Sequence, residues 1–244
     1  MALLKRVRRG ELEPVEALGE LSSLPFRNLG FARVDLHREL RQGAPEVVLA
    51  DGKLPEQVVE IVRAMLGGGA GSVLVTRAEA EVRAAVRLEA PDAHEDELAG
   101  LVWIERALPE RRGHVTIVSG GTSDAPVVHE ARVRAELLGT TVSVHEDVGV
   151  AGLHRLADAL PDLDRADCVI VVAGMDAALA SVVGGLVAAP VIGVPTSVGY
   201  GSAESGRTAL NAMLTSCAAS LAVVGIDDGL GAGTVAARIA RGRD

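Results

Sequence analysis

The second half of the chain alternates between short apolar runs and longer Ala-rich stretches, with Gly- and Ser-rich turns between them. The short runs are rich in β-branched residues and almost continuously apolar, which is typical of parallel strands buried on both faces. The pattern predicts five strands, each followed by a helix. The strands are expected at 114–119, 141–145, 168–173, 190–194 and 221–226, and the helices at 125–138, 152–160, 177–188, 205–217 and in a last stretch toward Arg241.

This alternation predicts an α/β fold built on a doubly wound parallel sheet, because right-handed crossovers place helices on both faces of the sheet. Ligands of such sheets bind at the carboxyl ends of the strands. We therefore expect the functional residues of this half in the loops that follow the strands.

The first half is more charged and less regular, and it predicts a smaller α/β domain. Helices are expected at 11–21 and 55–66, and strands at 32–34, 47–50 and 72–76. Charges and helix breakers interrupt the apolar pattern at 90–97 and 109–113. We place the boundary near Arg112, which gives a smaller N-terminal domain at 1–112 and a larger domain at 113–244.

Composition restricts the class of partner. The chain has 24 Lys and Arg against 33 Asp and Glu, a net charge of −9, which disfavours nucleic acid as a partner. Only 2% of its residues are aromatic, which leaves few platforms for base stacking.

The uncharged stretch 177–203 is interrupted by Gly and Pro, so buried sheet core is predicted rather than a membrane span. The basic start is followed by Glu11 and Glu13, which is unlike a secretory signal. With two cysteines and no disulfide framework, a reducing cytoplasm fits.

The strongest local motif follows the first strand of the predicted sheet. It consists of Ser119, Gly120, Gly121, Thr122, Ser123 and Asp124. Small residues let the backbone close on a ligand, hydroxyls supply donors, and the N-terminus of the next helix favours a phosphate. The motif is neither a Walker A loop nor a dinucleotide fingerprint. The same residues can simply cap the helix, and the pattern leaves both interpretations open.

Further candidate site residues follow the later strands and are expected at the same edge of the sheet. They are Asp147, His154, Arg155, Met175, Asp176, Thr196 and Tyr200. Acidic side chains such as Asp147 and Asp176 can act as a general base, bind Mg²⁺ or cap a helix. Tyr200 lies between glycines and can cover a planar substrate or anchor its own loop.

The two cysteines differ in their surroundings. Cys168 lies within an apolar strand and is predicted to be an inert core residue. Cys217 lies near the end of a predicted helix and precedes small residues that leave room around a thiol. A helix C-terminus does not favour a thiolate, so a cationic substrate or a basic neighbour would have to do so. Cys217 is a candidate nucleophile or a packing residue.

Several segments together carry a resemblance to a known family. They are 32–47, 119–124, 147–155, 172–175, 183–187, 195–201 and 211–218, with Ile226 and Asp227. In this order and spacing they resemble the LarB family, pyridinium-3,5-biscarboxylic acid mononucleotide synthase. Its C-terminal domain is similar to aminoimidazole ribonucleotide carboxylase and has a flavodoxin-like sheet. The resemblance covers nearly the whole chain.

The resemblance implies the first step in making the nickel-pincer nucleotide cofactor of lactate racemase. In this step nicotinic acid adenine dinucleotide is carboxylated on its pyridinium ring with CO₂ or bicarbonate. Its phosphoanhydride is hydrolysed, which releases AMP and pyridinium-3,5-biscarboxylic acid mononucleotide. Mg²⁺ and a homo-oligomer are implied as well, octamers being common in this fold. The sequence does not assign the residues that would hold the metal.

The family chemistry also implies residue roles. The Cys217 thiolate would add to the ring, and Asp176 would remove the ring proton, although the family more often has Glu at this position. The expected substrate- and phosphate-binding residues are Ser119, Gly121, Thr122, Ser123, Asp124, Asp147, His154, Arg155, Met175, Thr196 and Tyr200. One alternative is an aminoimidazole ribonucleotide carboxylase or mutase, which would not need Cys217. Another is a nucleotide-binding protein without turnover.

Overall fold

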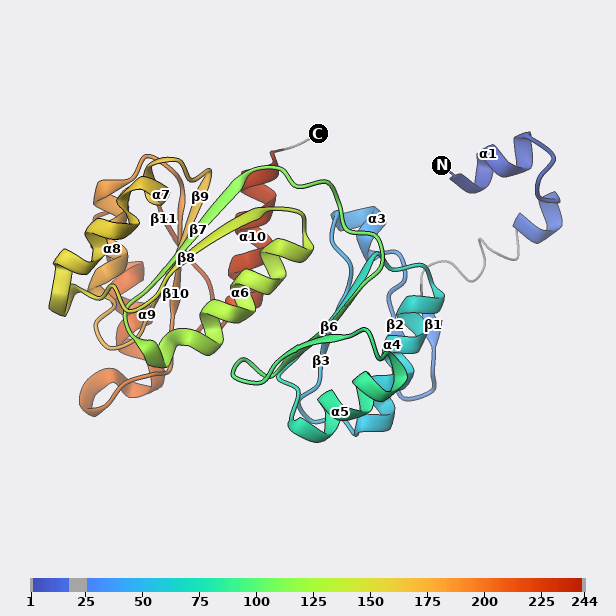
Figure 1. Cartoon of the computed structure of the whole chain (residues 1–244), viewed down its shortest axis with the longest axis horizontal. Helices are drawn as coiled ribbons and strands as arrows, with labels where there is room; N and C mark the ends of the chain where they lie inside the picture. The colour runs from blue at the N-terminus through green and yellow to red at the C-terminus, as the bar shows by residue number, and fades with distance from the viewer. Residues whose placement is uncertain (1, 18–25, 243–244) are drawn as a thin grey trace. The chain divides into compact units, whose positions relative to one another are not determined.

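The computed structural model describes residues 2–17 and 26–242 (Figure 1). The chain forms two compact units. The first unit comprises Met1–His94 and Val102–Ala107, and the second comprises Glu95–Leu101 and Leu108–Asp244. From Leu108 onward the chain belongs to the second unit, and this point lies a few residues before the boundary predicted near Arg112. The segment Glu95–Leu101 joins the second unit ahead of that point.

A five-stranded parallel sheet forms the centre of the second unit (Figure 1). Its strands are β7 (His114–Ser119), β8 (Thr141–His145), β9 (Cys168–Ala173), β10 (Val191–Pro195) and β11 (Leu221–Val223). They lie in the order β11-β10-β9-β7-β8. This is the flavodoxin-like order, in which the direction of winding reverses between the first and third strands of the sheet. The predicted fold is confirmed.

Both faces of this sheet are covered. In β9 every residue is buried, and alternate side chains join opposite apolar clusters. One cluster contains Val169 and Val171 with residues of α8 (Ala178–Leu186) and α9 (Arg207–Leu214). The other contains Ile170 and Val172 with residues of α6 (Ala125–Leu137) and α10 (Gly229–Arg241). Burying each such side chain contributes roughly 1.5–3 kcal/mol, so the continuous apolar runs account for the doubly wound arrangement.

The predicted helix 152–160 is wrong in type. Residues Val150–Ala159 form the 3-10 segment η2, which is interrupted at Gly152 by a non-helical φ of −140°. The short helix α7 (Leu160–Asp164) follows, with Pro161 in its first turn. Because Pro lacks a backbone donor and is best tolerated at a helix start, the helix begins there rather than running through the whole stretch.

Two further predicted elements are too long. The helix expected at 205–217 is α9, which begins only at Arg207 because Glu204 and Ser205 have left-handed backbones and the N-cap Gly206 has a φ of 90°. It ends at Leu214. Cys217 therefore lies beyond the helix. The strand expected at 221–226 ends at Val223, and a turn with a left-handed Asp227 leads into α10.

The first unit contains a four-stranded sheet in the order β3-β4-β6-β5. Its strands are β3 (Val47–Leu49), β4 (Ser72–Thr76), β5 (His94–Asp96) and β6 (Leu101–Glu105), the end of β5 and the start of β6 being counted with the second unit. An apolar core joins β4 and β6 to α4 (Pro55–Gly67) and α5 (Ala80–Glu89). The remaining elements are α1 (Ala2–Arg8), the hairpin β1 (Arg27–Asn28) and β2 (Arg33–Val34), and α3 (Arg38–Gln42).

The sequence predicts β3, β4 and α4 closely but misses α5, β5 and β6. The charged stretch 90–97 contains β5, which pairs into the sheet, and the chain first passes from one unit to the other within it, between His94 and Glu95. Of the predicted helix 11–21, residues 14–17 are helical, 11–13 are not, and 18–21 lie outside the described residues. Within 2–17 and 26–242, no helix is long and apolar enough to cross a membrane.

Candidate functional site

A cavity of about 640 Å³ opens at the carboxyl ends of β7 and β9. These strands are the neighbours between which the winding direction reverses, where doubly wound sheets bind their ligands. Seven of the predicted site residues line the cavity: Gly121, Thr122, Ser123, Asp124, Asp147, Met175 and Asp176. Six do not: Ser119, His154, Arg155, Thr196, Tyr200 and Cys217.

Asp124 holds the first loop in shape. Its Oδ2 accepts a hydrogen bond from the Gly121 amide at 3.0 Å, and its Oδ1 accepts one from the Thr196 hydroxyl at 2.7 Å. Burial raises the pKa of Asp124, and these two hydrogen bonds oppose that rise. Asp124 is 4% exposed and Thr196 is fully buried, so the pair ties the loop after β7 to the loop after β10.

The exposed hydroxyls of the first loop belong to Thr122 and Ser123 in η1 (Thr122–Asp124). Ser119 is instead fully buried, and its Oγ accepts a hydrogen bond from the Asp147 amide at 3.3 Å. The loop thus presents two free-standing hydroxyls and a helix start to the cavity, a combination suited to an anion. Ser119 does not line the cavity and instead joins the end of β7 to the loop after β8.

The loop after β8 brings one ion pair to the cavity. Asp147 has a left-handed backbone with a φ of 55°, and its carboxylate lies 2.6 Å from the guanidinium of Arg155. Both side chains are partly exposed, so an incoming anion can compete for Arg155. His154 is exposed.

The loop after β9 has a constrained backbone. Met175 and Ala177 both have left-handed φ values, 52° and 50°, a conformation that costs non-glycine residues about 1–2 kcal/mol. A Cβ on Gly174 would lie 2.2 Å from the carbonyl oxygen of Val198, so only glycine fits there. Asp176 is exposed, and its Oδ1 accepts a hydrogen bond from the Ala178 amide at 3.2 Å, which caps α8.

Tyr200 is 81% exposed and lies at the start of the 3-10 segment η3 (Gly201–Gly206), outside the cavity lining. The neighbouring Gly199 approaches Met175, since a Cβ on Gly199 would lie 3.2 Å from the Met175 sulfur. The loop after β10 therefore packs on the loop after β9, while the tyrosine ring remains in solvent.

The two cysteines occupy opposite environments. Cys168 is fully buried in β9, and burial raises the pKa of its thiol to about 12. Cys217 is free and exposed in the segment after α9. That segment lies against α8, where the Ser216 and Ser181 hydroxyls are 2.7 Å apart. Of the two thiols, Cys217 is the one that a substrate can reach.

The described part of the chain contains no group of three or more His, Cys, Asp or Glu side chains able to hold a metal ion. A resident metal centre built from these residues therefore does not fit the structure. Any divalent ion at the cavity would need most of its ligands from the substrate and water, which is a common arrangement for Mg²⁺.

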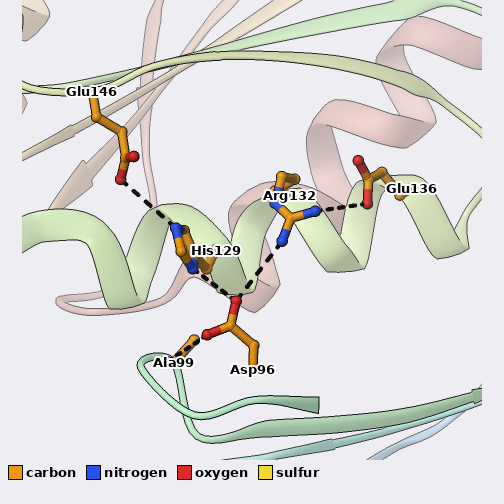
Figure 2. Close-up of polar contacts among 6 residues, drawn as sticks. All are labelled: Asp96, Ala99, His129, Arg132, Glu136 and Glu146. Carbon is orange, nitrogen blue, oxygen red and sulfur yellow. Dashed lines mark hydrogen bonds and ion pairs between the residues drawn. The ribbon is translucent and has the colours of Figure 1, made fainter. Parts of the chain in front are cut away.

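A polar network lies on α6, between Asp96 and Glu146 (Figure 2). His129 Nδ1 lies 2.7 Å from Asp96, and its Nε2 lies 3.8 Å from Glu146, the residue before Asp147. Arg132 lies 3.8 Å from Asp96 and 3.3 Å from Glu136. Sequence reasoning did not identify this network. The signal was the three-residue spacing of His129 and Arg132, which places both on one helix face.

Two family models match the chain. The one described as LarB/PurE-like N-terminal domain matches residues 26–106, and the one described as AIR carboxylase matches residues 114–244. An uncharacterized protein of Methanocaldococcus jannaschii is 39% identical over 219 residues, which are 86% of this chain and 84% of that protein. A crystal structure of a PurE2 variant from Treponema denticola matches 50% of this chain and 76% of that one, with 22% identity and a TM-score of 0.41.

The cavity belongs to the part of the chain that the AIR carboxylase model matches. The two family matches identify a carboxylase-type enzyme of the AIR carboxylase superfamily. The chain belongs to the LarB family and carries an AIR carboxylase-like C-terminal domain.

Proposed function

We propose that the protein carboxylates the pyridinium ring of nicotinic acid adenine dinucleotide with CO₂ or bicarbonate. We propose further that it hydrolyses the phosphoanhydride, releasing AMP and pyridinium-3,5-biscarboxylic acid mononucleotide. The observation that carries the proposal is the exposed Cys217 thiol beside α8, the helix whose first residues line the cavity. An aminoimidazole substrate is already an enamine and would not need a thiol.

The chemistry explains the need for a nucleophile. A pyridinium ring is electron-poor and does not attack CO₂. When the Cys217 thiolate adds to the ring carbon para to nitrogen, the ring becomes a neutral dihydropyridine, and the carbon next to the adduct becomes an enamine nucleophile. That carbon forms the new bond to CO₂. A base then removes its proton, and departure of the thiolate restores the aromatic cation, so the net change exchanges a ring proton for a carboxylate.

Asp176 is the proposed base. It lines the cavity and is exposed, so it can reach a bound ring, and its present hydrogen bond to the Ala178 amide fixes one oxygen while the other remains available. An aspartate reaches about one methylene less far than the glutamate that the family more often has. Asp176→Asn is expected to lower carboxylation by about 100-fold or more, and Asp176→Glu to retain it.

Three residues are proposed to bind the phosphates. Thr122 and Ser123 supply exposed hydroxyls at the start of α6, and Arg155 supplies a positive charge that now pairs with Asp147. Mg²⁺ is proposed to enter with the pyrophosphate, which would provide most of its ligands together with water. A homo-oligomer is proposed as well, because Val150, Leu153 and Leu160 are between 38% and 51% exposed along one stretch of the second unit.

The test is mass spectrometry of the products formed from nicotinic acid adenine dinucleotide, isotopically labelled bicarbonate and Mg²⁺. Label in a mononucleotide, with AMP beside it, is the expected result. Cys217→Ala should give no labelled product, whereas Cys168→Ala, at the buried thiol, should retain it. Carboxylation by Cys217→Ala would exclude the covalent route. Absence of label with the unchanged protein, combined with activity on aminoimidazole ribonucleotide, would favour the alternative carboxylase or mutase.

A further inference from the structure

The hydroxyl group of Ser216 closes a turn in the segment that carries Cys217. Residues 216–218 follow α9 without regular secondary structure. The Oγ of Ser216 accepts a hydrogen bond from the Ala218 amide at 3.2 Å, which forms a small turn with Cys217 at its centre. Serine hydroxyls commonly close such turns by bonding a backbone amide two residues on. The backbone on both sides of Cys217 is therefore tied to a single oxygen atom.

The same oxygen is tied to α8. Ser216 Oγ lies 2.7 Å from Ser181 Oγ, so one hydroxyl donates to the other. Gly184, three residues after Ser181, lies on the same helix face. A Cβ on Gly184 would lie 2.8 Å from the Cβ of Ala218, so the turn packs directly on that face. A hydrogen bond and a close packing contact thus fix the turn against the helix.

Helix α8 connects this turn to the cavity. The residues at its start, Ala178 and Leu179, line the cavity, and Asp176 caps the helix there. Ser181 is three residues after the first residue of α8, about 4.5 Å along the helix axis. A rigid helix of this length holds the proposed base and the turn around Cys217 at a set separation.

We propose that Ser181 and Ser216 are positioning residues that set the placement of the Cys217 thiol, and this inference rests on the proposed function. The hydroxyl pair fixes the turn on α8, so that the thiol meets the ring carbon of a bound pyridinium in the required orientation. Neither serine takes part in bond formation. Their contribution is orientation, and a displacement of about 1 Å can cost on the order of 100-fold in rate.

The first test compares Ser216→Ala and Ser181→Ala with the matched control Ser220→Ala. Ser220 also contacts α8, but through a longer contact of 3.4 Å to the carbonyl oxygen of Gly184, beyond the turn. In the carboxylation assay, kcat of the first two variants should fall by about 10- to 100-fold, while KM for the dinucleotide changes by less than about threefold. Ser220→Ala should match the unchanged protein, and Ser216→Thr, which keeps the hydroxyl, should recover most of kcat.

The second test does not depend on the proposed substrate. Hydrogen exchange of the Ala218 amide should accelerate in Ser216→Ala, which removes the acceptor of this amide, and in Ser181→Ala, which removes the partner that fixes the acceptor. It should not change in Ser220→Ala. Alkylation of Cys217 by iodoacetamide should become at least about threefold faster in the same two variants, since a released turn lets the already exposed thiol adopt more of the orientations in which it can attack the reagent. Cys168 should stay unreactive while the protein is folded.

The outcomes separate the two proposals. Slower carboxylation together with faster exchange and faster alkylation supports the positioning role. Unchanged exchange and alkylation in both serine variants would overturn it, and so would unchanged kcat despite faster exchange. If the unchanged protein does not carboxylate the dinucleotide, the proposed function fails. The exchange and alkylation rates then still decide whether the serines control the thiol.

Discussion

The buried hydroxyl of Thr196 is expected to stabilise the cavity loop through Asp124. It donates to Asp124 Oδ1 over 2.7 Å, and both side chains are buried. Thr196→Val keeps the branched shape and removes the donor. Because a hydrogen bond to a charged group contributes roughly 1.5–3 kcal/mol, we expect the variant to lose about that much free energy of unfolding near neutral pH.

The effect should depend on pH in a defined direction. Burial raises the pKa of Asp124 above its ordinary value, and the hydrogen bond from Thr196 opposes this rise, so the pKa should rise further in the variant. A carboxyl group whose pKa is higher in the folded state binds its proton more readily there than in the unfolded chain. The folded state therefore gains stability as the pH falls through the folded pKa. This gain is larger in Thr196→Val, so the difference between the two proteins should be greatest above that pKa and shrink below it.

Urea unfolding followed by circular dichroism, in a series from about pH 8 down to about pH 4, measures this difference. Thr196→Ser is the matched control, because it retains the hydroxyl and should retain most of the stability. The reasoning is refuted if Thr196→Ser is as unstable as Thr196→Val. A difference that stays constant over the whole pH series would also refute it, since Asp124 would then not be the acceptor that matters.

Two further predictions concern α8 and the ion pair at the cavity. Gly184→Ala places a Cβ 2.8 Å from a methyl carbon of the adjoining turn and should cost about 1–3 kcal/mol, whereas Gly185→Ala meets nothing within 4 Å and should stabilise the helix by about 0.5–1 kcal/mol. Thermal melts of the two variants should shift in opposite directions, and shifts of the same sign would contradict the packing. Arg155→Ala leaves the Asp147 carboxylate unpaired at the cavity, so KM for the dinucleotide should rise by roughly 10- to 100-fold. Arg165→Ala, an exposed arginine paired outside the cavity, is the control, and an equal rise there would argue against a role for Arg155.

The fully buried strands β9 and β10 are predictable because burial on both faces makes them continuously apolar. The run at Cys168–Ala173 is an example, and its bounds agree with the prediction. The segment after β8 is not predictable in this way. Its apolar spacing resembles a helix, but the conformation depends on the backbone of Gly152 and on Pro161, which interrupt a regular helix.

The sequence predicts that the loops after β7, β8 and β9 lie at one edge of the sheet, where residues of all three line the cavity, but it does not separate the roles of these residues. Thr122 and Thr196 are both hydroxyl residues after apolar strands, yet one is exposed at the cavity and the other is buried on Asp124. That distinction depends on which loop packs on which, and it is set by tertiary contacts. The contact between Ser181 and Ser216 joins residues 35 positions apart, so no local pattern reveals it.

The position of β9 at the centre of the sheet has a consequence for how the chain reaches its fold. Its six residues are uncharged and rich in Val and Ile, a composition that favours association between exposed strands of different molecules. Both of its edges are paired in the folded protein, by β7 and by β10. The chain reaches β10 from β9 through α8, and β8 lies between β7 and β9 in the sequence, so both pairings require closure of a loop, which slows folding. Until both pairings form, this hexapeptide can associate with other unfolded molecules, and refolding yield should decrease as protein concentration increases.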